Sequence, residues 1–347
     1  ADMSRGLGDV YKRQDERRKL TAPGECGPAK VERRFEAMGT DVHLVLTGPG
    51  PGEAMKWLDD AEELIRRSER RWSRFVESSE VSEMNRTAGQ ITVVSEETFD
   101  LLEIAIQAWM ATNGAFDPTI GAAVLRSGYH SDFSLINEPV DGGGRANRLG
   151  DSHARRRSDR NLAGEIQMNR PTLTAQLAPE TILDFGGIAK GYVADLTAEL
   201  LTASGVDGCC VNIGGDIRVA GVGPDDGAWN IEVSCEGAEE SRVLRLGAGA
   251  VCSSSKSKRH WLTTDGPAHH LIDPVTGDSR SDGPQTAVAV AATATAAEVI
   301  TKWMMADGDP GCFDATGLVV SNDGIIIGCR GLNRYLVDSR LPSRRRS

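Results

Sequence analysis

Two adjacent glycines and a lysine stand in mid-chain between a short apolar run and an apolar-rich segment, within Asp184 to Asp195 (DFGGIAKGYVAD). Residues 181–183 predict a strand before the glycines, and residues 192–201 predict a helix after them. Glycines at such a junction let backbone N–H groups approach a ligand, and a helix N-terminus beside Lys190 favours an anion such as phosphate. The alternative is a tight strand-to-helix turn with a surface lysine, because short glycine patterns often match by chance.

The composition is ordinary for a soluble globular protein. Hydrophobic residues make up 39% and charged residues 26% of the 347 residues, which are enough to bury a large core in one or two domains. The net charge of −11, from 39 basic and 50 acidic side chains, disfavours a general nucleic-acid binder because phosphates would be repelled. We find no apolar run long enough to span a membrane.

The seven cysteines are scattered and odd in number, and no CxxC pair occurs. This pattern suggests neither a zinc site nor a disulfide framework and favours reduced, mostly buried thiols. The thiols and the lack of a visible signal segment favour a cytoplasmic location, although the chain's first residues weaken that argument.

The first residues differ from the rest of the chain. The run GLGDVYKRQ within residues 1–14 resembles translated sequencing-adaptor read-through of metagenomic assemblies. We therefore expect residues 1–28 to be non-native or disordered, with the true N-terminus and any export signal missing. One domain is expected over residues 29–338, with a long loop at 128–162 and a basic disordered tail at 339–347.

Apolar periodicity along the chain predicts the elements that must position these residues. Helices are expected at 51–72, 95–111 and 294–305, with short helical turns at 78–85. Strands are expected at 41–46, 166–168, 172–174, 208–212, 213–219, 229–234, 242–246, 250–255, 285–292, 317–321, 324–328 and 334–337. Because strands outnumber helices and mostly connect by short turns, the fold class is α+β, with mixed and antiparallel sheets and flanking helices.

Four further motifs accompany the glycine turn. They are Met38-Gly39-Thr40, Phe116-Asp117-Pro118-Thr119, Asn212-Ile213-Gly214-Gly215-Asp216 and His270 to Gly277 (HLIDPVTG). In this order the set resembles the ApbE family, the FAD:protein FMN transferases, over roughly residues 33–330. The resemblance implies a single α+β unit of two lobes with FAD held between them.

The resemblance also implies a reaction. Such enzymes cleave the pyrophosphate of FAD and join FMN through a phosphoester to a Ser or Thr of an acceptor flavoprotein, releasing AMP with the help of Mg²⁺. Attack on phosphorus requires neutralisation of the phosphate oxygens, which a lysine, a helix N-terminus and a cation can supply. Two alternatives stay open: hydrolysis of FAD to FMN and AMP, and FAD binding without turnover.

Residue roles follow from the matched motifs. The catalytic candidates are His270 as a base or phosphate contact, Lys190 on the diphosphate, and Asp184. The residues expected to bind FAD are Met38, Thr40, Asp117, Gly187, Lys190, Asn212, Gly214, Gly215, Ser253, Ser254, His270 and Asp273.

Each of these roles has a structural alternative. Asp184 can instead cap the glycine turn, and Asp273 can fix an Asx turn before its proline. Asn212 can tie its own loop, Met38 can belong to the core, and His270 can be structural.

The metal site is where the match departs from the family. The expected ligands are Ala189, Glu298 and Thr301, but the family's usual Asp and following Thr, four residues apart, correspond here to Glu298 and Lys302. A charged lysine cannot ligate a cation, and Glu-to-Lys at this spacing favours an ion pair. Thr301 points about 100° away around the helix. Either the cation is held differently, or Lys302 replaces part of its charge.

A second departure lies in the predicted strand at 250–255. Ser253-Ser254-Ser255 stands where many family members carry Thr-Ser-Gly, so a row of hydroxyls remains but a glycine is lost.

Overall fold

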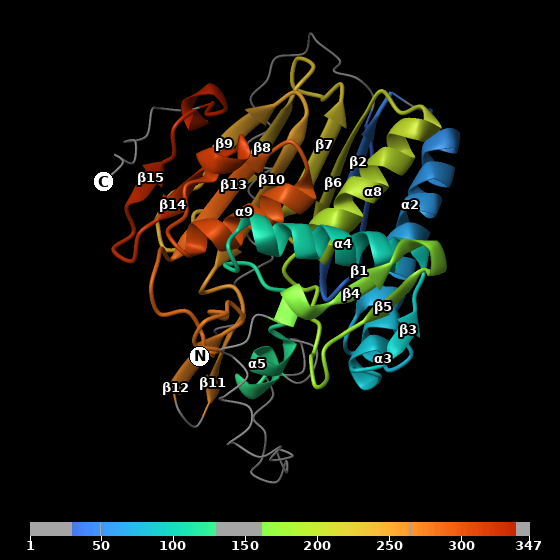
Figure 1. Ribbon diagram of the computed structural model, residues 1–347. Helices are drawn as coiled ribbons and strands as arrows, with labels where there is room; N and C mark the ends of the chain where they lie inside the picture. Colours follow the sequence, from blue (N-terminus) through green and yellow to red (C-terminus); the bar gives the residue numbers. More distant parts are fainter. Residues whose placement is uncertain (1–29, 49, 130–161, 264–265, 338–347) are drawn as a thin grey trace, which may run out of the picture.

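The computed structural model describes residues 30–48, 50–129, 162–263 and 266–337 (Figure 1). The predictions for residues 1–28 and 339–347, and nearly all of the loop expected at 128–162, lie outside the described residues.

An eight-stranded sheet forms the centre of the fold (Figure 1). Every neighbouring pair of its strands is antiparallel. In spatial order the strands are β1 (Lys30–Ala37), β2 (Thr40–Thr47), β6 (Gly208–Ile213), β7 (Asp216–Gly221), β10 (Gly249–Ser255), β13 (Thr286–Ala291), β14 (Thr316–Val320) and β15 (Ile326–Gly328).

Three helices cover one face of this sheet, and a fourth crosses their ends in Figure 1. The covering helices are α2 (Pro51–Trp72), α8 (Ala189–Ser204) and α9 (Ala294–Met305), and the crossing helix is α4 (Glu96–Ala111). Smaller helices are α3 (Glu80–Arg86), α5 (Gly121–Arg126), η2 (Leu162–Glu165), η3 (Arg170–Thr172), η4 (Pro310–Phe313) and η5 (Leu332–Arg334). No helix in the described ranges is both long and apolar enough to cross a membrane.

Three smaller antiparallel sheets surround the central one. They pair β3 (Ile91–Val93), β5 (Thr174–Gln176) and β4 (Gln167–Asn169), then β8 (Trp229–Val233) with β9 (Arg242–Leu246), and β11 (His260–Thr263) with β12 (Gly266–His269).

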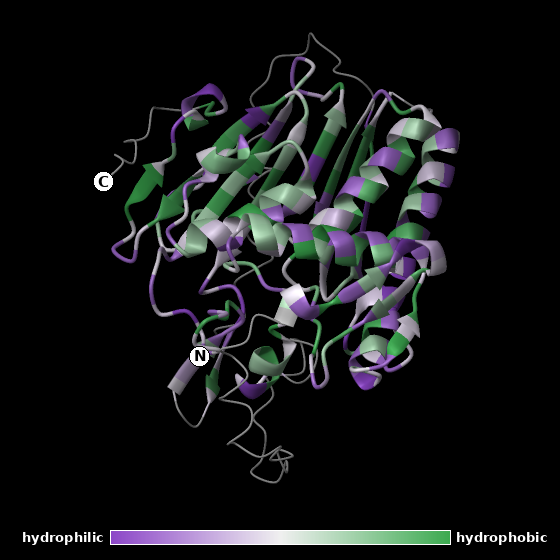
Figure 2. Ribbon diagram, viewed as in Figure 1, coloured by the Kyte–Doolittle hydropathy of each residue, from purple (hydrophilic) through white to green (hydrophobic). Residues whose placement is uncertain are grey.

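The side chains of the central strands alternate between two buried layers. Ala250, Cys252 and Ala289 belong to the core beneath the helices, whereas Val251 and Val288 belong to a second core shared with β8 and β9. Because successive side chains on a strand point to opposite faces, both faces of β10 and β13 are buried. Accordingly, β13 carries apolar residues at every position after Thr286, and β10 is apolar or small up to Cys252 before it ends in three serines (Figure 2). The small residues beneath the helices let α9 lie close to the sheet.

Helices α8 and α9 meet at the glycine that follows Lys190. A Cβ added to Gly191 would lie 2.4 Å from the carbonyl oxygen of Ala294. Asp195, one turn later on α8, accepts hydrogen bonds from the backbone N–H groups of Ala294 and Thr295, both at 2.8 Å. Its carboxylate therefore caps the N-terminus of α9, where it also meets the positive end of the helix dipole. These contacts fix the position of α9 against α8.

We expect Gly191→Ala to lower the free energy of unfolding by about 1–3 kcal/mol, because the new methyl group overlaps a backbone oxygen that cannot move alone. Gly52→Ala is the matched control, since a Cβ at that helical glycine meets nothing within 4 Å. Urea denaturation of both variants checks the prediction. Equal free energies of unfolding for the two variants would contradict the prediction, because they would mean that α8 and α9 can move apart at no cost in stability.

The α+β class predicted from the sequence is confirmed, with corrections to individual elements. The strand expected at 172–174 begins only at Thr174, after a 3-10 turn, and the strand expected at 213–219 is divided by the turn at Gly214-Gly215. Residues 181–183 are not a strand, because only Ile182 forms a bridge, to Ile120. Residues 334–337 form no strand either, since a 3-10 turn and a single bridge at Leu336 occupy this region. Helix α8 begins at Ala189, three residues earlier than predicted. All pairings between the described strands are antiparallel, so the expectation of a mixed sheet is wrong. The parallel bridge between Ile120 and Ile182 lies outside the named strands.

Several elements of the structure were not predicted, namely strands β1, β3, β11 and β12, helix α5 and the four 3-10 turns η2 to η5. Strand β1 and the hairpin of β11 and β12 are rich in charged, polar or small residues, so their apolar periodicity is weak.

Candidate functional site

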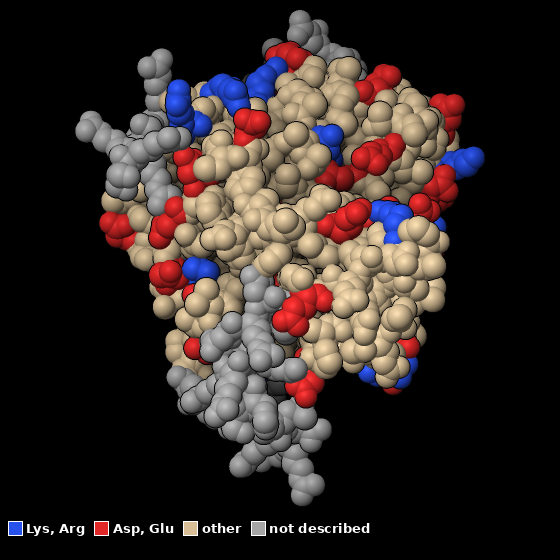
Figure 3. Space-filling view, in the orientation of Figure 1, with Lys and Arg blue, Asp and Glu red and all other residues tan. Residues whose placement is uncertain are grey.

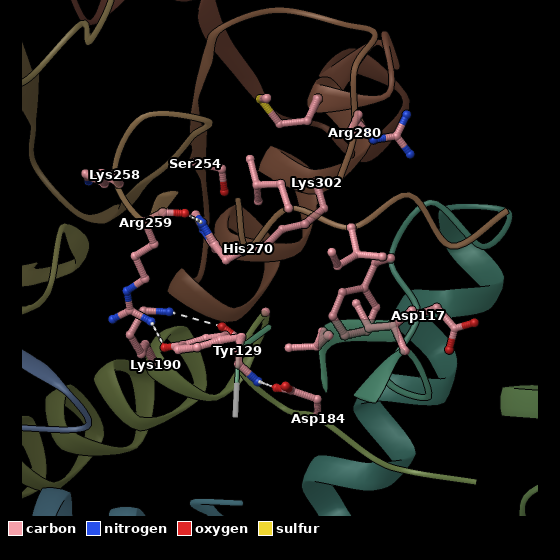
Figure 4. Close-up of a pocket in the computed structure, with 18 of the residues that line it drawn as sticks. Asp117, Tyr129, Asp184, Lys190, Ser254, Lys258, Arg259, His270, Arg280 and Lys302 are labelled. Carbon is pink, nitrogen blue, oxygen red and sulfur yellow. Dashed lines mark hydrogen bonds between the residues drawn. The ribbon is translucent and has the colours of Figure 1, made fainter. Parts of the chain in front are cut away.

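A pocket lies where the loops and turns at one end of the central sheet meet α8, α9 and α5 (Figure 4). Its empty volume is about 1120 Å³, including space open to solvent. Five basic side chains line it against three acidic ones, which is an excess of two positive charges. The basic residues are Lys190, Lys258, Arg259, Arg280 and Lys302, and the acidic ones are Asp117, Asp184 and Asp216.

This local excess contrasts with the net charge of −11 for the chain. On the face seen in Figure 3, basic and acidic side chains are interspersed. A cleft that concentrates positive charge on an acidic protein favours an anionic ligand of small size.

An ion pair between Arg74 and Asp184 supports the glycine turn. Asp184 accepts a hydrogen bond from the backbone N–H of Gly186 at 2.7 Å, and its other oxygen lies 2.9 Å from Nε of Arg74. The guanidinium of Arg74 also lies against the rings of Phe75 and Tyr129. Asp184 therefore caps the turn, as the structural alternative proposed, and both its oxygens are engaged.

Lys190 is positioned by two carboxylates on different elements. Its Nζ lies 2.7 Å from Oε1 of Glu298 on α9 and 3.1 Å from Oδ2 of Asp216 at the start of β7. Burial alone would lower the pKa of Lys190, but Asp216 and Glu298 outweigh burial and raise it. Lys190 is therefore a fixed, permanently charged ammonium at the N-terminus of α8.

Glu298 is fully buried, accepts two hydrogen bonds and forms one further ion pair. Besides Lys190, the backbone N–H of Gly191 donates to its Oε2 at 2.8 Å, and Nζ of Lys302 lies 3.5 Å from its Oε1. Burial lowers the pKa of Lys302, and Glu298 opposes that shift. The carboxylate thus ties the two lysines to the start of α8.

Thr301 is also fully buried, and its hydroxyl is engaged. It donates to the backbone oxygen of Glu298 at 2.7 Å and pairs with the hydroxyl of Ser254 at 2.7 Å. Among the described residues, no group of three or more His, Cys, Asp or Glu side chains is arranged to hold a metal ion. As arranged, Ala189, Glu298 and Thr301 do not fit a divalent cation, because two ammonium groups already surround the carboxylate of Glu298.

Two hairpin turns lie side by side at the pocket, because β2 pairs with β6. Both have two central residues at positive φ, as type I′ turns require: Met38 (57°) with Gly39 (64°), and Gly214 (63°) with Gly215 (94°). A Cβ at Gly214 would lie 2.5 Å from Oγ1 of Thr40, so the glycine allows the turns to touch.

Two residues predicted in these turns support them instead of facing the pocket. The Asn212 side-chain oxygen accepts from the N–H of Gly215 at 2.8 Å, so Asn212 ties its own loop. Met38 packs against the main core, and its N–H donates to Glu69 at 2.7 Å.

His270 lines the pocket from the segment after β12 and lies against Arg259. The carbonyl oxygen of Arg259 accepts from the backbone N–H of His270 at 3.2 Å and lies 3.3 Å from its Nδ1 (Figure 4). Burial and then the Arg259 charge lower the pKa of His270 well below its ordinary value of 6.5. The imidazole is therefore neutral near pH 7 and can accept a proton.

The lowered pKa of His270 has a consequence for stability. Below about pH 6.5 the unfolded chain binds a proton that the folded chain refuses, so the free energy of unfolding falls as the pH falls. We expect His270→Asn to reduce this pH dependence; part of it remains because the pKa values of His43 and His269 are also lowered. Urea unfolding between pH 5 and about 7.5 measures the slopes. A variant with the wild-type slope would contradict the prediction.

Asp117 and Asp273 both form Asx turns. Asp117 accepts from the N–H and hydroxyl of Thr119 at 2.7 and 2.6 Å, and burial raises its pKa while these bonds oppose the shift. Asp273 accepts from the N–H of Val275 at 2.9 Å and lies 3.4 Å from Arg280. Asp117 lines the pocket, whereas Asp273 shapes the loop that brings Arg280 there.

Ser253 and Ser254 lie at the end of β10 and line the pocket. Nζ of Lys258 donates to Oγ of Ser253 at 2.9 Å. The same Nζ would lie 3.2 Å from a Cβ at Gly215. Ser253 therefore holds the ammonium group of Lys258 beside the hairpin turn at Gly214-Gly215.

The structure thus brings most of the predicted residues together. Those lining the pocket are Thr40, Asp117, Asp184, Gly187, Lys190, Gly214, Ser253, Ser254 and His270. Those outside its lining are Met38, Ala189, Asn212, Gly215, Asp273, Glu298 and Thr301.

Sequence reasoning missed several charged residues of the site. Arg74, Lys258, Arg259 and Arg280 were not predicted, and Asp216 entered only as the last residue of a matched motif. The basic run at 256–259, directly after the strand that ends in serines, is the one local signal that could have found two of them.

Comparison with known proteins shows the family. The ApbE family model matches residues 38–313. A curated relative from Vibrio cholerae serotype O1, named FAD:protein FMN transferase, is 27% identical over 266 residues, covering 74% of this chain and 75% of the relative. A second relative of that name, from Treponema pallidum, is 27% identical over 277 residues, covering 74% of each chain.

Solved structures show the same fold. The ApbE protein from Thermotoga maritima superposes with a TM-score of 0.77 at 23% identity, over 89% of this chain and 100% of that one. The flavin transferase ApbE from Vibrio cholerae gives a TM-score of 0.72 at 20% identity, with coverage of 89% and 100%. The resemblance predicted from the five motifs is confirmed, and the chain belongs to the ApbE family.

Proposed function

We propose that this protein is an FAD:protein FMN transferase, which joins FMN to a Ser or Thr of an acceptor flavoprotein and releases AMP. One observation carries the proposal: the matched motifs of a family with that activity meet around a single pocket with an excess of positive charge. That pocket suits the diphosphate, which carries the negative charge of FAD.

The glycine turn and Lys190 bind the diphosphate in this proposal. Phosphoryl transfer needs little covalent help from the protein, so positioning and neutralisation of the phosphate oxygens supply most of the catalysis. Lys190 is suited to this because Glu298 and Asp216 fix its ammonium before the substrate arrives. Gly187 adds close backbone approach beside the start of α8.

His270 acts as the general base. The acceptor hydroxyl oxygen bonds to the FMN phosphorus while its proton passes to the imidazole. The bond from that phosphorus to the bridging oxygen breaks, and AMP leaves with the oxygen. The neutral state of His270 supports this role, since a protonated imidazole could not accept the proton.

Family membership implies a magnesium ion, which would neutralise phosphate charge when bound. The residues Ala189, Glu298 and Thr301 do not fit such an ion here, and the steps above use only the chain's own groups.

The reaction is tested by incubating the protein with FAD and Mg²⁺, with and without an acceptor protein carrying an Asp-x-x-Ser/Thr-Gly-Ala-Thr-like site. Transferase activity releases AMP in equal amount to acceptor-bound FMN. Release of AMP with free FMN in both samples would indicate hydrolysis by water instead. Absence of AMP under every condition would leave FAD binding without turnover.

A further inference from the structure

We propose that the ammonium group of Lys302, held by Glu298, occupies the place of a divalent cation beside the FAD diphosphate, so that FAD binding and cleavage proceed without added metal. This inference rests on the proposed transferase function and concerns how the same pocket neutralises its substrate.

The first support is the arrangement around Glu298. Lys190 and Lys302 lie 2.7 and 3.5 Å from the same carboxylate oxygen, Oε1, and Gly191 donates to the other oxygen. A buried carboxylate that would otherwise ligate a cation instead carries two ammonium groups. Both lysines line the pocket, so the pair presents its charge to a bound ligand.

The second support is the balance of charge. Lys190 and Lys302 are matched by Glu298 and Asp216, so the cluster is neutral before any ligand binds. A divalent cation placed beside them would add two positive charges within a few ångströms of two ammonium groups, which is unfavourable in a partly buried site. The Lys302 ammonium supplies one positive charge at the place where a divalent cation would supply two.

The third support is how the lysine is packed. The Cε atom of Lys302 lies 3.4 Å from where a Cβ of Gly187 would stand, so its stem runs directly over the glycine turn. The neighbouring Thr301 cannot serve as a ligand in its place without breaking its bonds to Ser254 and to the Glu298 backbone. The space beside the turn is therefore taken by the lysine.

The test compares wild type with three variants in EDTA and in MgCl₂. Lys302→Met removes the charge and keeps the stem, Lys302→Arg keeps a charge, and Lys302→Thr restores the hydroxyl usual in the family. Lys56→Thr is the matched control, because Lys56 is an exposed helical lysine outside the pocket. Quenching of flavin fluorescence gives the dissociation constant of FAD, chromatography gives AMP release, and circular dichroism confirms folding.

We expect wild type and Lys56→Thr to bind and cleave FAD equally well in EDTA and in MgCl₂. Whatever its own affinity for FAD, Lys302→Arg should show no difference between EDTA and MgCl₂, because it keeps the charge. Lys302→Met should bind FAD about 10- to 100-fold more weakly in both, as expected for loss of a charged contact. Lys302→Thr should show that loss in EDTA and recover in MgCl₂, because the vacated space and Glu298 then admit a cation.

Two results would overturn the inference while leaving the transferase function standing: loss of FAD cleavage by wild type in EDTA, or wild-type behaviour of Lys302→Met and Lys302→Thr in EDTA. Failure of wild type to bind FAD under either condition would overturn the proposed function itself, and the inference with it.

Discussion

Replacing Lys190 with methionine is expected to lower FMN transfer by about 100- to 1000-fold, because one fixed positive charge is lost where negative charge develops. The same change should destabilise the protein by about 3–5 kcal/mol, since it leaves the buried carboxylates of Glu298 and Asp216 without their main partner. The initial rate of AMP release and the midpoint of urea unfolding measure the two effects separately.

A second substitution separates catalysis from folding. Adding Glu298→Gln to Lys190→Met removes one of the unpaired charges, and the amide oxygen can still accept from the N–H of Gly191. Stability should largely return, because removing both members of a buried ion pair costs less than removing one. Activity should stay low. Recovery of activity together with stability would mean that Lys190 is structural only.

Replacing His270 with asparagine is expected to lower the turnover number by about 100- to 10,000-fold, the usual contribution of a general base. The Michaelis constant for FAD should change little, because the proposed role concerns the acceptor hydroxyl. In the wild type, activity should fall only below pH 6.5, as the neutral imidazole becomes protonated. The variant should have lost that acidic limb.

His260→Asn is the matched control for His270. His260 is exposed on β11 and lies outside the pocket, so its replacement should leave the rate and its pH profile unchanged. Equal rates for His270→Asn and wild type would exclude the base role, even if the variant had lost stability.

Sequence reasoning succeeded where a local pattern determines the structure. The glycine turn before α8 was predicted to lie at the site because glycine permits close approach of the backbone. Gly214 and Gly215 were predicted at the site from the resemblance, although they fell within an expected strand and instead form a hairpin turn at positive φ. The motif order then indicated that they share one ligand. The short runs of apolar and small residues at 250–255 and 285–292 likewise predicted strands close to the observed bounds of β10 and β13.

The rest depended on contacts between distant parts of the chain. The pairs Arg74 with Asp184 and Lys190 with Glu298 each join residues about 110 positions apart, and no local pattern marks them. The same holds for Ile182, whose apolar run predicts a strand but whose single bridge partner is Ile120. Gly121, the residue after Ile120, lets the two chain segments approach closely, because a Cβ there would lie 2.6 Å from the Ile182 carbonyl oxygen.

The charge arrangement at α9 is the most informative of these contacts. From sequence, Glu298 and Lys302 could be either a distorted metal site or an ion pair. The structure places Lys190 and Lys302 around the carboxylate of Glu298, so α9 brings an ammonium group to the glycine turn that precedes α8.

The intact mass of an acceptor protein after incubation with FAD shows whether FMN is transferred. We expect a mass increase equal to one esterified FMN, located by fragmentation on one Ser or Thr and absent when that residue is changed to Ala. The adduct should be greatly reduced with Lys190→Met and with His270→Asn. An acceptor of unchanged mass, in a sample where AMP and free FMN accumulate, would contradict the transferase assignment.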